Sequence, residues 1–252
     1  MRYFLKLRYK GAQYRGWQIQ PNVVSVQEVI NDSLEKLLGS STETIGCGRT
    51  DAGVHAREFY LHFDFDKREL DLKDFVLRLT GMKLPGIQFL SLHRMADDAH
   101  ARFHALSRSY EYWIITERDP FLDGLAYYHY KPLDIEAMNK ACSYLLGKKD
   151  FSCFSKTNTQ VMTSICDLSH AQFVVEDYKI IFKITANRFL RNMVRAIVGT
   201  LIEIGEGKRS PEWIEEVIHS QSRTVAGSSV EACGLYLTKI TYPENFNLSE
   251  QL

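Results

Sequence analysis

The sequence has no net charge, because 31 lysines and arginines balance 31 aspartates and glutamates. A chain without a cationic excess does not attract a polyanion through its overall charge. A nucleic-acid partner would therefore have to meet a local basic surface. Composition alone does not suggest RNA.

Long apolar runs are also lacking. No segment reaches the roughly 18 apolar residues that a membrane-spanning helix needs, and residues 1–10 alternate charged and apolar side chains, unlike the apolar core of a signal peptide. We therefore expect no membrane association and a cytoplasmic location.

Cysteine pairs are absent as well. The five cysteines are odd in number and include no C-x-x-C pair: Cys47, Cys142, Cys153, Cys166 and Cys233. This pattern favours buried thiols in a reducing compartment over a disulfide framework or a zinc cage.

Apolar residues make up 45% of the 252 residues, enough for one large core or two small ones. In the first half, Ser25 and Glu28 form a predicted capping box for a helix that Gly39 ends. Alternation and helical periodicity there predict strands at 3–9, 42–47, 58–66 and 87–92 and helices at 26–38 and 71–79.

The second half repeats the same order of elements. Its patterns predict strands at 107–116, 164–175, 178–186 and 235–242, and helices at 134–146 and 189–204 with a short helix starting at Ser210. Two successive β-α-β-β-α-β units predict an α+β protein of two ferredoxin-like halves, with antiparallel sheets forming a central cleft. We place the boundary near Ala105. Residues 1–105 then contain the candidate catalytic loop at 48–56, and residues 106–252 contain the arginine-bearing helix at 189–204, both described below.

Residues 48–56, GRTDAGVHA, combine two glycines, a cation, a carboxylate and an imidazole between two predicted strands. Asp before Gly is also an ordinary turn residue, and spacing alone favours that interpretation for Asp51. If Arg49 keeps Asp51 ionised on a rigid loop, however, the carboxylate can serve as nucleophile or base.

Arg188, Arg191 and Arg195 are spaced at i, i+3 and i+7 in the predicted helix 189–204 and its start, so they would share one face. Three guanidiniums in a row suit phosphates or a catalytic carboxylate, although a solvated helix face is equally compatible with the pattern.

Residues 101–113 interleave cations and aromatic residues, an arrangement that suits unpaired bases. Arg102 and Tyr110 are the candidates for RNA contact, whereas Trp113 fits a packed core better. The histidines at 55, 62, 93, 100 and 104 raise a metal hypothesis, with Asp51 and His55 or His100 and His104 as pairs. No third ligand has suitable spacing, so hydrogen-bonded imidazoles are favoured over a metal site.

Residues 48–56 closely resemble the signature of the tRNA pseudouridine synthase A family. The resemblance extends over nearly the whole chain through these segments: YKG at 9–11, GWQ at 16–18, SVQ at 25–27, HARF at 100–103, YEY at 110–112, DFS at 150–152, FLRNMVR at 189–195 and GLYL at 234–237. It implies isomerisation of uridine to pseudouridine at positions 38 to 40 of the tRNA anticodon stem-loop, by base flipping.

The resemblance also implies residue roles. Asp51 would be the catalytic aspartate with Arg195 as its catalytic partner, Tyr110 would stack on the target base, and Arg49 would help to extrude it. Arg102, Arg188 and Arg191 remain candidate substrate contacts. The family implies a homodimer in which one tRNA contacts both subunits, with no cofactor and no metal.

Three features depart from the family's usual pattern: Cys47 in place of a small alanine, Arg191 and Asn192 in place of histidines, and residues 230–233 in place of a Thr-Ala-Pro-Ala run. They leave open the local RNA contacts and the last loop. Two other functions also remain open, a non-catalytic RNA-binding module and a metal-dependent hydrolase or nuclease that uses Asp51 and the histidines.

Overall fold

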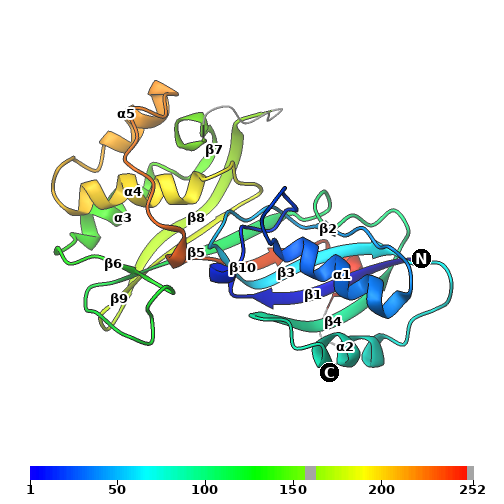
Figure 1. Ribbon diagram of the computed structural model, residues 1–252. Coiled ribbons are helices and arrows are strands. Elements are labelled where there is room, and N and C mark those ends of the chain that lie inside the picture. The colour runs from blue at the N-terminus through cyan, green and yellow to red at the C-terminus, as the bar shows by residue number, and fades with distance from the viewer. Residues whose placement is uncertain (157–162, 249–252) are drawn as a thin grey trace. The chain divides into compact units, whose positions relative to one another are not determined.

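The computed structural model describes residues 1–156 and 163–248. The chain divides into two compact units: unit 1 comprises Met1–Leu106 and Leu237–Leu252, and unit 2 comprises Ser107–Tyr236. Both units combine helices with mostly antiparallel strands (Figure 1), which confirms the predicted α+β class. The observed division differs from the expected one at the C-terminal end, where the chain returns to unit 1.

Unit 1 has the order strand, helix, two strands, helix, strand that the sequence predicts. Its elements are β1 (Arg2–Tyr9), α1 (Val26–Leu38), β2 (Ile45–Gly46), β3 (His55–Asp64), α2 (Leu72–Gly81) and β4 (Ile87–Met95), joined at the end by β10 (Leu235–Thr241). The strands follow the order β4-β1-β3-β10, and β2 also pairs with β3. β1 therefore lies in the middle, antiparallel to β3 and to β4.

The helix α1 begins and ends where local chemistry predicts. The Ser25 hydroxyl accepts a hydrogen bond from the Glu28 amide, and the Glu28 carboxylate accepts one from the Ser25 amide. Gly39 ends the helix in the left-handed conformation, with φ of 67°. α1 is thus defined at both ends by its own sequence.

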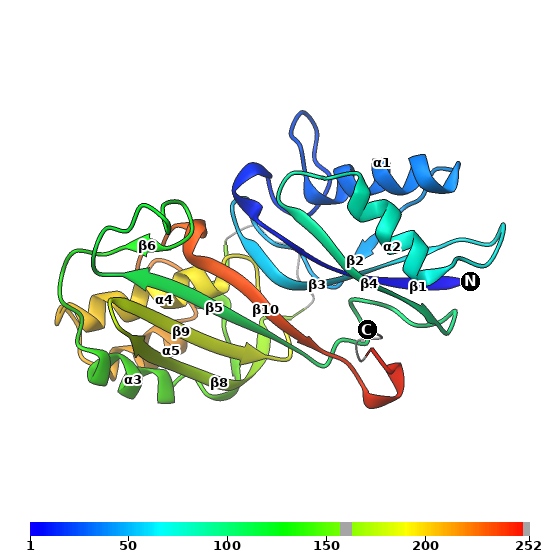
Figure 2. The same cartoon turned by 90° about the horizontal axis from the view of Figure 1, so that it is seen from below.

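Both faces of the unit 1 sheet are covered around β3. α1 and α2 lie over one face, and the C-terminal segment after β10 lies over the other (Figure 2). There the rings of Tyr242 and Phe246 contact Phe4 at centroid distances of 5.8 and 5.9 Å. His62 on β3 is accordingly buried, with 2% of its surface exposed.

Unit 2 contains the second set of elements. They are β5 (Ser107–Ile115), β6 (Tyr127–Tyr128), α3 (Ile135–Ser143), β7 (Gly147–Asp150), β8 (Ile165–Glu176), β9 (Lys179–Ala186), α4 (Met193–Gly205) and α5 (Trp213–Ser220). The strand order is β5-β9-β8-β7, and β6 pairs in parallel with β5. The Asn139 side chain ties α3 to β8 by donating to the Phe173 carbonyl and accepting from its amide, at 3.1 and 2.7 Å.

The predicted arginine helix is wrong in its first turn. α4 starts at Met193, not at Phe189, because Asn192 adopts a left-handed conformation with φ of 67° that interrupts a helix. Arg188 and Arg191 therefore lie in the connection before α4, and Arg195 alone of the three lies on the helix. The short strands β6 and β7 were not predicted.

All five cysteines are free, and four of them are buried, as the sequence indicated. None of the helices within residues 1–156 and 163–248 is long and apolar enough to cross a membrane.

Candidate functional site

The loop that carries Asp51 connects β2 to β3 in unit 1. Its backbone turns tightly, because the Val54 amide donates to the Asp51 carbonyl at 3.1 Å and Gly53 adopts a φ of 81°. A side chain at Gly53 would strain this conformation. Asp51 is half-buried at the turn, and Arg49 is exposed two residues before it.

The last residue of β1 and the segment that follows it hold this loop in place. The Tyr9 hydroxyl is hydrogen-bonded to the Thr50 hydroxyl at 2.8 Å, and the Trp17 amide donates to the Thr50 carbonyl at 3.1 Å. A Cβ on Gly16 would lie 2.7 Å from the Thr50 carbonyl oxygen, and one on Gly11 would overlap the Val54 carbonyl. The glycines thus allow two backbone segments to touch, and this contact fixes the position of the residue before Asp51.

The imidazoles near these candidates bind backbone amides. Nδ1 of His55 accepts from the Gly11 amide at 3.0 Å. Nδ1 of His100 accepts from the amides of Arg102 and Phe103 at 3.1 and 3.2 Å, and Nδ1 of His104 accepts from the His100 amide at 3.1 Å. No group of three or more His, Cys, Asp or Glu side chains that could hold a metal ion occurs among the described residues. The imidazoles order loops instead.

Tyr110 lies on β5 of unit 2, opposite Ile184 of β9. Its half-buried ring meets Phe189 edge to face, with the centroids 5.1 Å apart. Phe189 lies in the connection between β9 and α4, so this contact links the orientation of the Tyr110 ring to that connection. A tyrosine supported in this way presents a flat surface of defined orientation.

Arg195 lies in the first turn of α4 and is half-buried. Its Nε donates to the Val230 carbonyl at 2.7 Å, and the Val230 amide donates to the Arg195 carbonyl at 3.2 Å. The neighbouring Glu231 carbonyl accepts from the Tyr112 hydroxyl at 2.8 Å. The connection after α5 is therefore attached to both α4 and β5.

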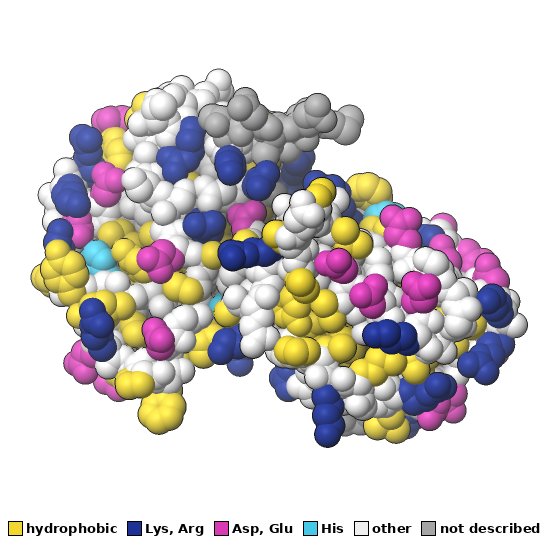
Figure 3. All heavy atoms as spheres, in the orientation of Figure 1, with side chains coloured by type: hydrophobic (Ala, Val, Ile, Leu, Met, Phe, Trp, Pro, Cys, Tyr) yellow, Lys and Arg dark blue, Asp and Glu magenta, His cyan; other side chains and the backbone are white. Residues whose placement is uncertain are grey.

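The other arginine candidates occupy loops. Arg102 is exposed and lies over the Phe103 ring, 5.8 Å from its centroid. Arg191 is exposed, and its carbonyl accepts from the Lys156 amide at 3.1 Å. Arg188 is half-buried and lies near the Cys166 thiol. Burial raises the pKa of that thiol to about 11, and the positive charge of Arg188 acts in the opposite direction. In Figure 3, Lys and Arg side chains gather around β7 and the start of α4.

The seven predicted site residues fall into two sets. Unit 1 holds Arg49, Asp51 and Arg102, and unit 2 holds Tyr110, Arg188, Arg191 and Arg195. The supporting residues Gly11 and Gly16 belong to segments that the resemblance had singled out, but their contact with the Asp51 loop was not predicted. The only hint of this contact in the sequence was the presence of Gly11 and Gly16 in those segments, because glycine allows two backbone segments to approach closely.

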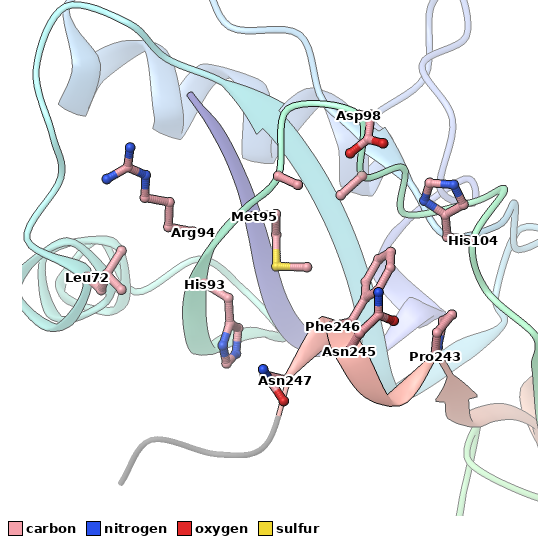
Figure 4. Close-up of a pocket in the computed structure, with 12 residues that line it drawn as sticks. Leu72, His93, Arg94, Met95, Asp98, His104, Pro243, Asn245, Phe246 and Asn247 are labelled. Carbon is pink, nitrogen blue, oxygen red and sulfur yellow. The ribbon is translucent and has the colours of Figure 1, made fainter.

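A separate pocket of about 760 Å³ lies in unit 1 and contains none of these seven residues. Figure 4 shows Met95 and Phe246 facing into it, His93 and Asn247 on one side and Asp98 and His104 on the other. His93 is hydrogen-bonded to Ser91 at 2.7 Å, and burial lowers its pKa. The pocket is therefore distinct from the predicted site residues of unit 1, Arg49, Asp51 and Arg102.

Comparison with known proteins gives the class of protein first: a family model described as tRNA pseudouridine synthase matches residues 141–243. The protein named tRNA pseudouridine synthase A of Bacteroides fragilis is 45% identical over 96% of this chain and 97% of its own length. That of Pseudoalteromonas translucida is 38% identical over 98% of this chain and 94% of its own. The chain belongs to the tRNA pseudouridine synthase A family.

A more distant likeness exists among solved structures. A chain of a Cbf5-Nop10-Gar1 complex aligns with 91% of this chain and 50% of its own length, at 11% identity and a TM-score of 0.37.

Proposed function

We propose that the protein converts uridine to pseudouridine in the anticodon stem-loop of tRNA, with Asp51 as the catalytic group. The relatives that match nearly the whole chain support the reaction. The structural observation that supports Asp51 is the fixed loop, in which Thr50 is held by Tyr9 and Trp17. Catalytic groups need such fixed geometry, since small displacements reduce rates strongly.

The proposed reaction starts with extrusion of the target uridine, because the base must leave its stack before a side chain reaches the glycosidic bond. Arg49 enters the RNA in its place, and Tyr110 stacks on the extruded base. Asp51, held by Arg195, then assists cleavage of the bond between N1 and the ribose. The base turns, C5 bonds to the ribose, and the proton on C5 leaves.

Substrate and product are isomers, so the balance of the reaction requires no oxidant, reductant or other co-reactant. We also propose, as the family resemblance implies, that catalysis needs no cofactor or metal. The exposed Arg191 and Arg102 and the half-buried Arg188 would contact the phosphates of the tRNA. The active form would be a homodimer in which one tRNA contacts both subunits, in the cytoplasm.

The decisive experiment incubates the protein with unmodified tRNA and maps the pseudouridines that form. For Asp51→Ala we expect unchanged tRNA binding and no release of tritium from tRNA labelled at uridine C5. Substantial release by this variant would refute the assignment of Asp51. Pseudouridines confined to sites outside the anticodon stem-loop would refute the proposed specificity.

The two rival functions give different results. A non-catalytic RNA-binding module would bind tRNA but form no pseudouridine at any enzyme concentration. A metal-dependent hydrolase would shorten the tRNA and stop working in EDTA, whereas isomerisation that survives EDTA excludes this mechanism.

Binding can be tested apart from chemistry. Because Arg191 is exposed and would contact a phosphate, Arg191→Ala should weaken tRNA binding and reduce the slope of log affinity against log salt by about 1. An unchanged slope would remove Arg191 from the interface. Light scattering after size exclusion, with and without tRNA, tests the proposed dimer.

A further inference from the structure

A single guanidinium shapes the connection between α5 and β10. Nη1 of Arg223 donates to the carbonyls of Ala226 and Gly227 at 3.2 and 2.9 Å. Its Nη2 donates to the Ser229 hydroxyl oxygen at 3.0 Å. Hydrogen bonds from a charged donor are stronger than neutral ones, so Arg223 stabilises the folded-back path of residues 226–229.

Ser229 joins this connection to the start of α4. Its hydroxyl oxygen also accepts from Nδ2 of Asn192, at 2.6 Å. Asn192 is the residue whose left-handed conformation sets where α4 begins. One serine oxygen therefore accepts from two donors, Arg223 of the connection and Asn192, the residue immediately before α4.

The depth of the connection is set by close packing on α4. A Cβ on Gly199 would overlap the Ser228 carbonyl, so backbone rests directly on the helix. The Gly227 amide donates to the Thr200 hydroxyl at 2.9 Å, and that hydroxyl donates to the Ala196 carbonyl at 2.8 Å. The connection cannot move closer to α4 without a clash between Ser228 and Gly199. The hydrogen bonds of Arg223 to residues 226, 227 and 229 hold its path in place.

The next residue after Ser229 holds Arg195. Because the Val230 carbonyl accepts from Nε of Arg195 at 2.7 Å, it sets the direction of the planar guanidinium and thereby of its two Nη groups. The Val230 amide completes the pair by donating to the Arg195 carbonyl at 3.2 Å. The orientation of Arg195 therefore depends on where Ser229 and Val230 lie.

We propose that Arg223 is a positioning residue for Arg195, acting through Ser229 and the backbone of residues 226–230. The catalytic consequence rests on the function proposed above, in which Arg195 holds Asp51. Arg223 needs no contact with the RNA or with Asp51 in this role.

A double-mutant cycle tests the proposal. Arg223→Ala should lower kcat for tritium release about 10- to 100-fold and change KM less than about threefold. In the Arg195→Lys background, which lacks the Nε–H donor, the same change should cost less than about twofold. Equal factors in both backgrounds would show that Arg223 does not act through Arg195 and would overturn the proposal.

Two further variants separate positioning from loss of folding. Arg223→Lys keeps the charge but lacks the planar fork, so its kcat should lie between the wild-type and alanine values. Arg209→Ala is the matched control, since Arg209 is another unit 2 arginine, stacked 4.9 Å from the Trp213 ring centroid; its kcat should equal the wild-type value. A similar loss of kcat in Arg209→Ala would overturn the specific role of Arg223.

A measurement independent of activity follows the Arg195 Nε–H signal by NMR. Its exchange with solvent should accelerate at least about tenfold in Arg223→Ala and in Ser229→Ala, because the Val230 carbonyl shifts. Unchanged exchange in both folded variants refutes the positioning role even if the enzyme is a pseudouridine synthase. If the wild type forms no pseudouridine, the proposed function fails, and this measurement alone decides the positioning role.

Discussion

Gly16 shows how a single residue can define the candidate site. It has a φ of 90°, and a Cβ there would lie 2.7 Å from the Thr50 carbonyl oxygen. Gly39 has a comparable φ of 67° with nothing within 4 Å. Replacing either glycine would therefore strain the backbone to a similar extent. Only a side chain at Gly16 would also press against the Asp51 loop.

We expect Gly16→Ala and Gly39→Ala each to lose about 1–2 kcal/mol of unfolding free energy through the left-handed backbone. Gly16→Ala should in addition lower kcat for pseudouridine formation at least about tenfold, because it displaces Thr50 and hence Asp51. Urea unfolding and tritium release measure the two effects. Equal kcat in the two variants would show that the contact does not fix the loop.

His62 connects a buried side chain to pH. Its Nδ1 accepts from the Ala101 amide at 3.1 Å, and burial together with the charge of Arg2 lowers its pKa to about 4, from 6.5. Above pH 6.5 neither the folded nor the unfolded state is protonated there. Between about pH 6.5 and 4 only the unfolded state takes up the proton, so stability falls with falling pH.

The expected loss from His62 is at most about 3 kcal/mol across this window. Unfolding free energies measured by urea at several pH values should show it. His62→Asn retains an acceptor for the Ala101 amide but does not titrate, so its stability should depend less on pH. The same slope in both proteins would mean that other groups cause the acid sensitivity.

At the scale of elements, α1 is the clearest case in which sequence defines structure. Ser25 is fully buried and caps α1 through the Glu28 amide at 3.2 Å. Ser25→Ala should therefore lower the unfolding free energy by about 1 kcal/mol. Thermal or urea unfolding measures this change, and Ser40→Ala, just beyond the C-terminal end of α1, is the control. Equal stability of the wild type and Ser25→Ala would contradict the capping role.

Most elements could be predicted because their periodicity and caps are local. The start of α4 could not, because the spacing of Arg188, Arg191 and Arg195 fits a helix that the conformation of Asn192 interrupts. Asparagine adopts positive φ more readily than most residues, but the sequence does not show when it does so. β6 and β7 have two and four residues, too few for a periodic pattern.

The candidate site, like the secondary structure, could be predicted only where the signal is local in the sequence. The sequence singled out Asp51 and its motif, yet the contacts of Gly11 and Gly16 with the loop depend on residues that are far apart in sequence. Arg223 carried no signal, because its role comes from three acceptors that only the folded connection brings together. The catalytic roles themselves remain predictions.

At the scale of the whole molecule, β10 has the largest consequence. It begins in unit 2 and continues in unit 1, where Leu237 and Ile240 are buried. In unit 1 the Ile240 amide donates to the Glu58 carboxylate at 2.8 Å, and the Tyr242 hydroxyl donates to the Ala101 carbonyl at 2.6 Å. Unit 1 therefore includes residues from both ends of the sequence.

A chain that ends at Tyr236 should leave unit 1 unfolded at 25 °C. Loss of Leu237 and Ile240 alone removes roughly 1.5–3 kcal/mol of burial each, against the 5–15 kcal/mol of a typical domain. Limited proteolysis should then cut within residues 1–106. Tyr242→Phe is the control, because it keeps β10 and the aromatic ring at position 242, and it should resist cleavage. Resistance of the truncated chain to the protease would contradict the prediction.

The position of β10 also sets an order of events during synthesis on the ribosome. Unit 2 is complete once Tyr236 has emerged, whereas unit 1, whose first 106 residues emerge earliest, still lacks a strand until Thr241 follows. At about 5–20 residues per second, those first residues wait roughly 7 to 27 seconds for their last strand. The half of the protein that carries Asp51 is thus the first to be translated and the last to be completed.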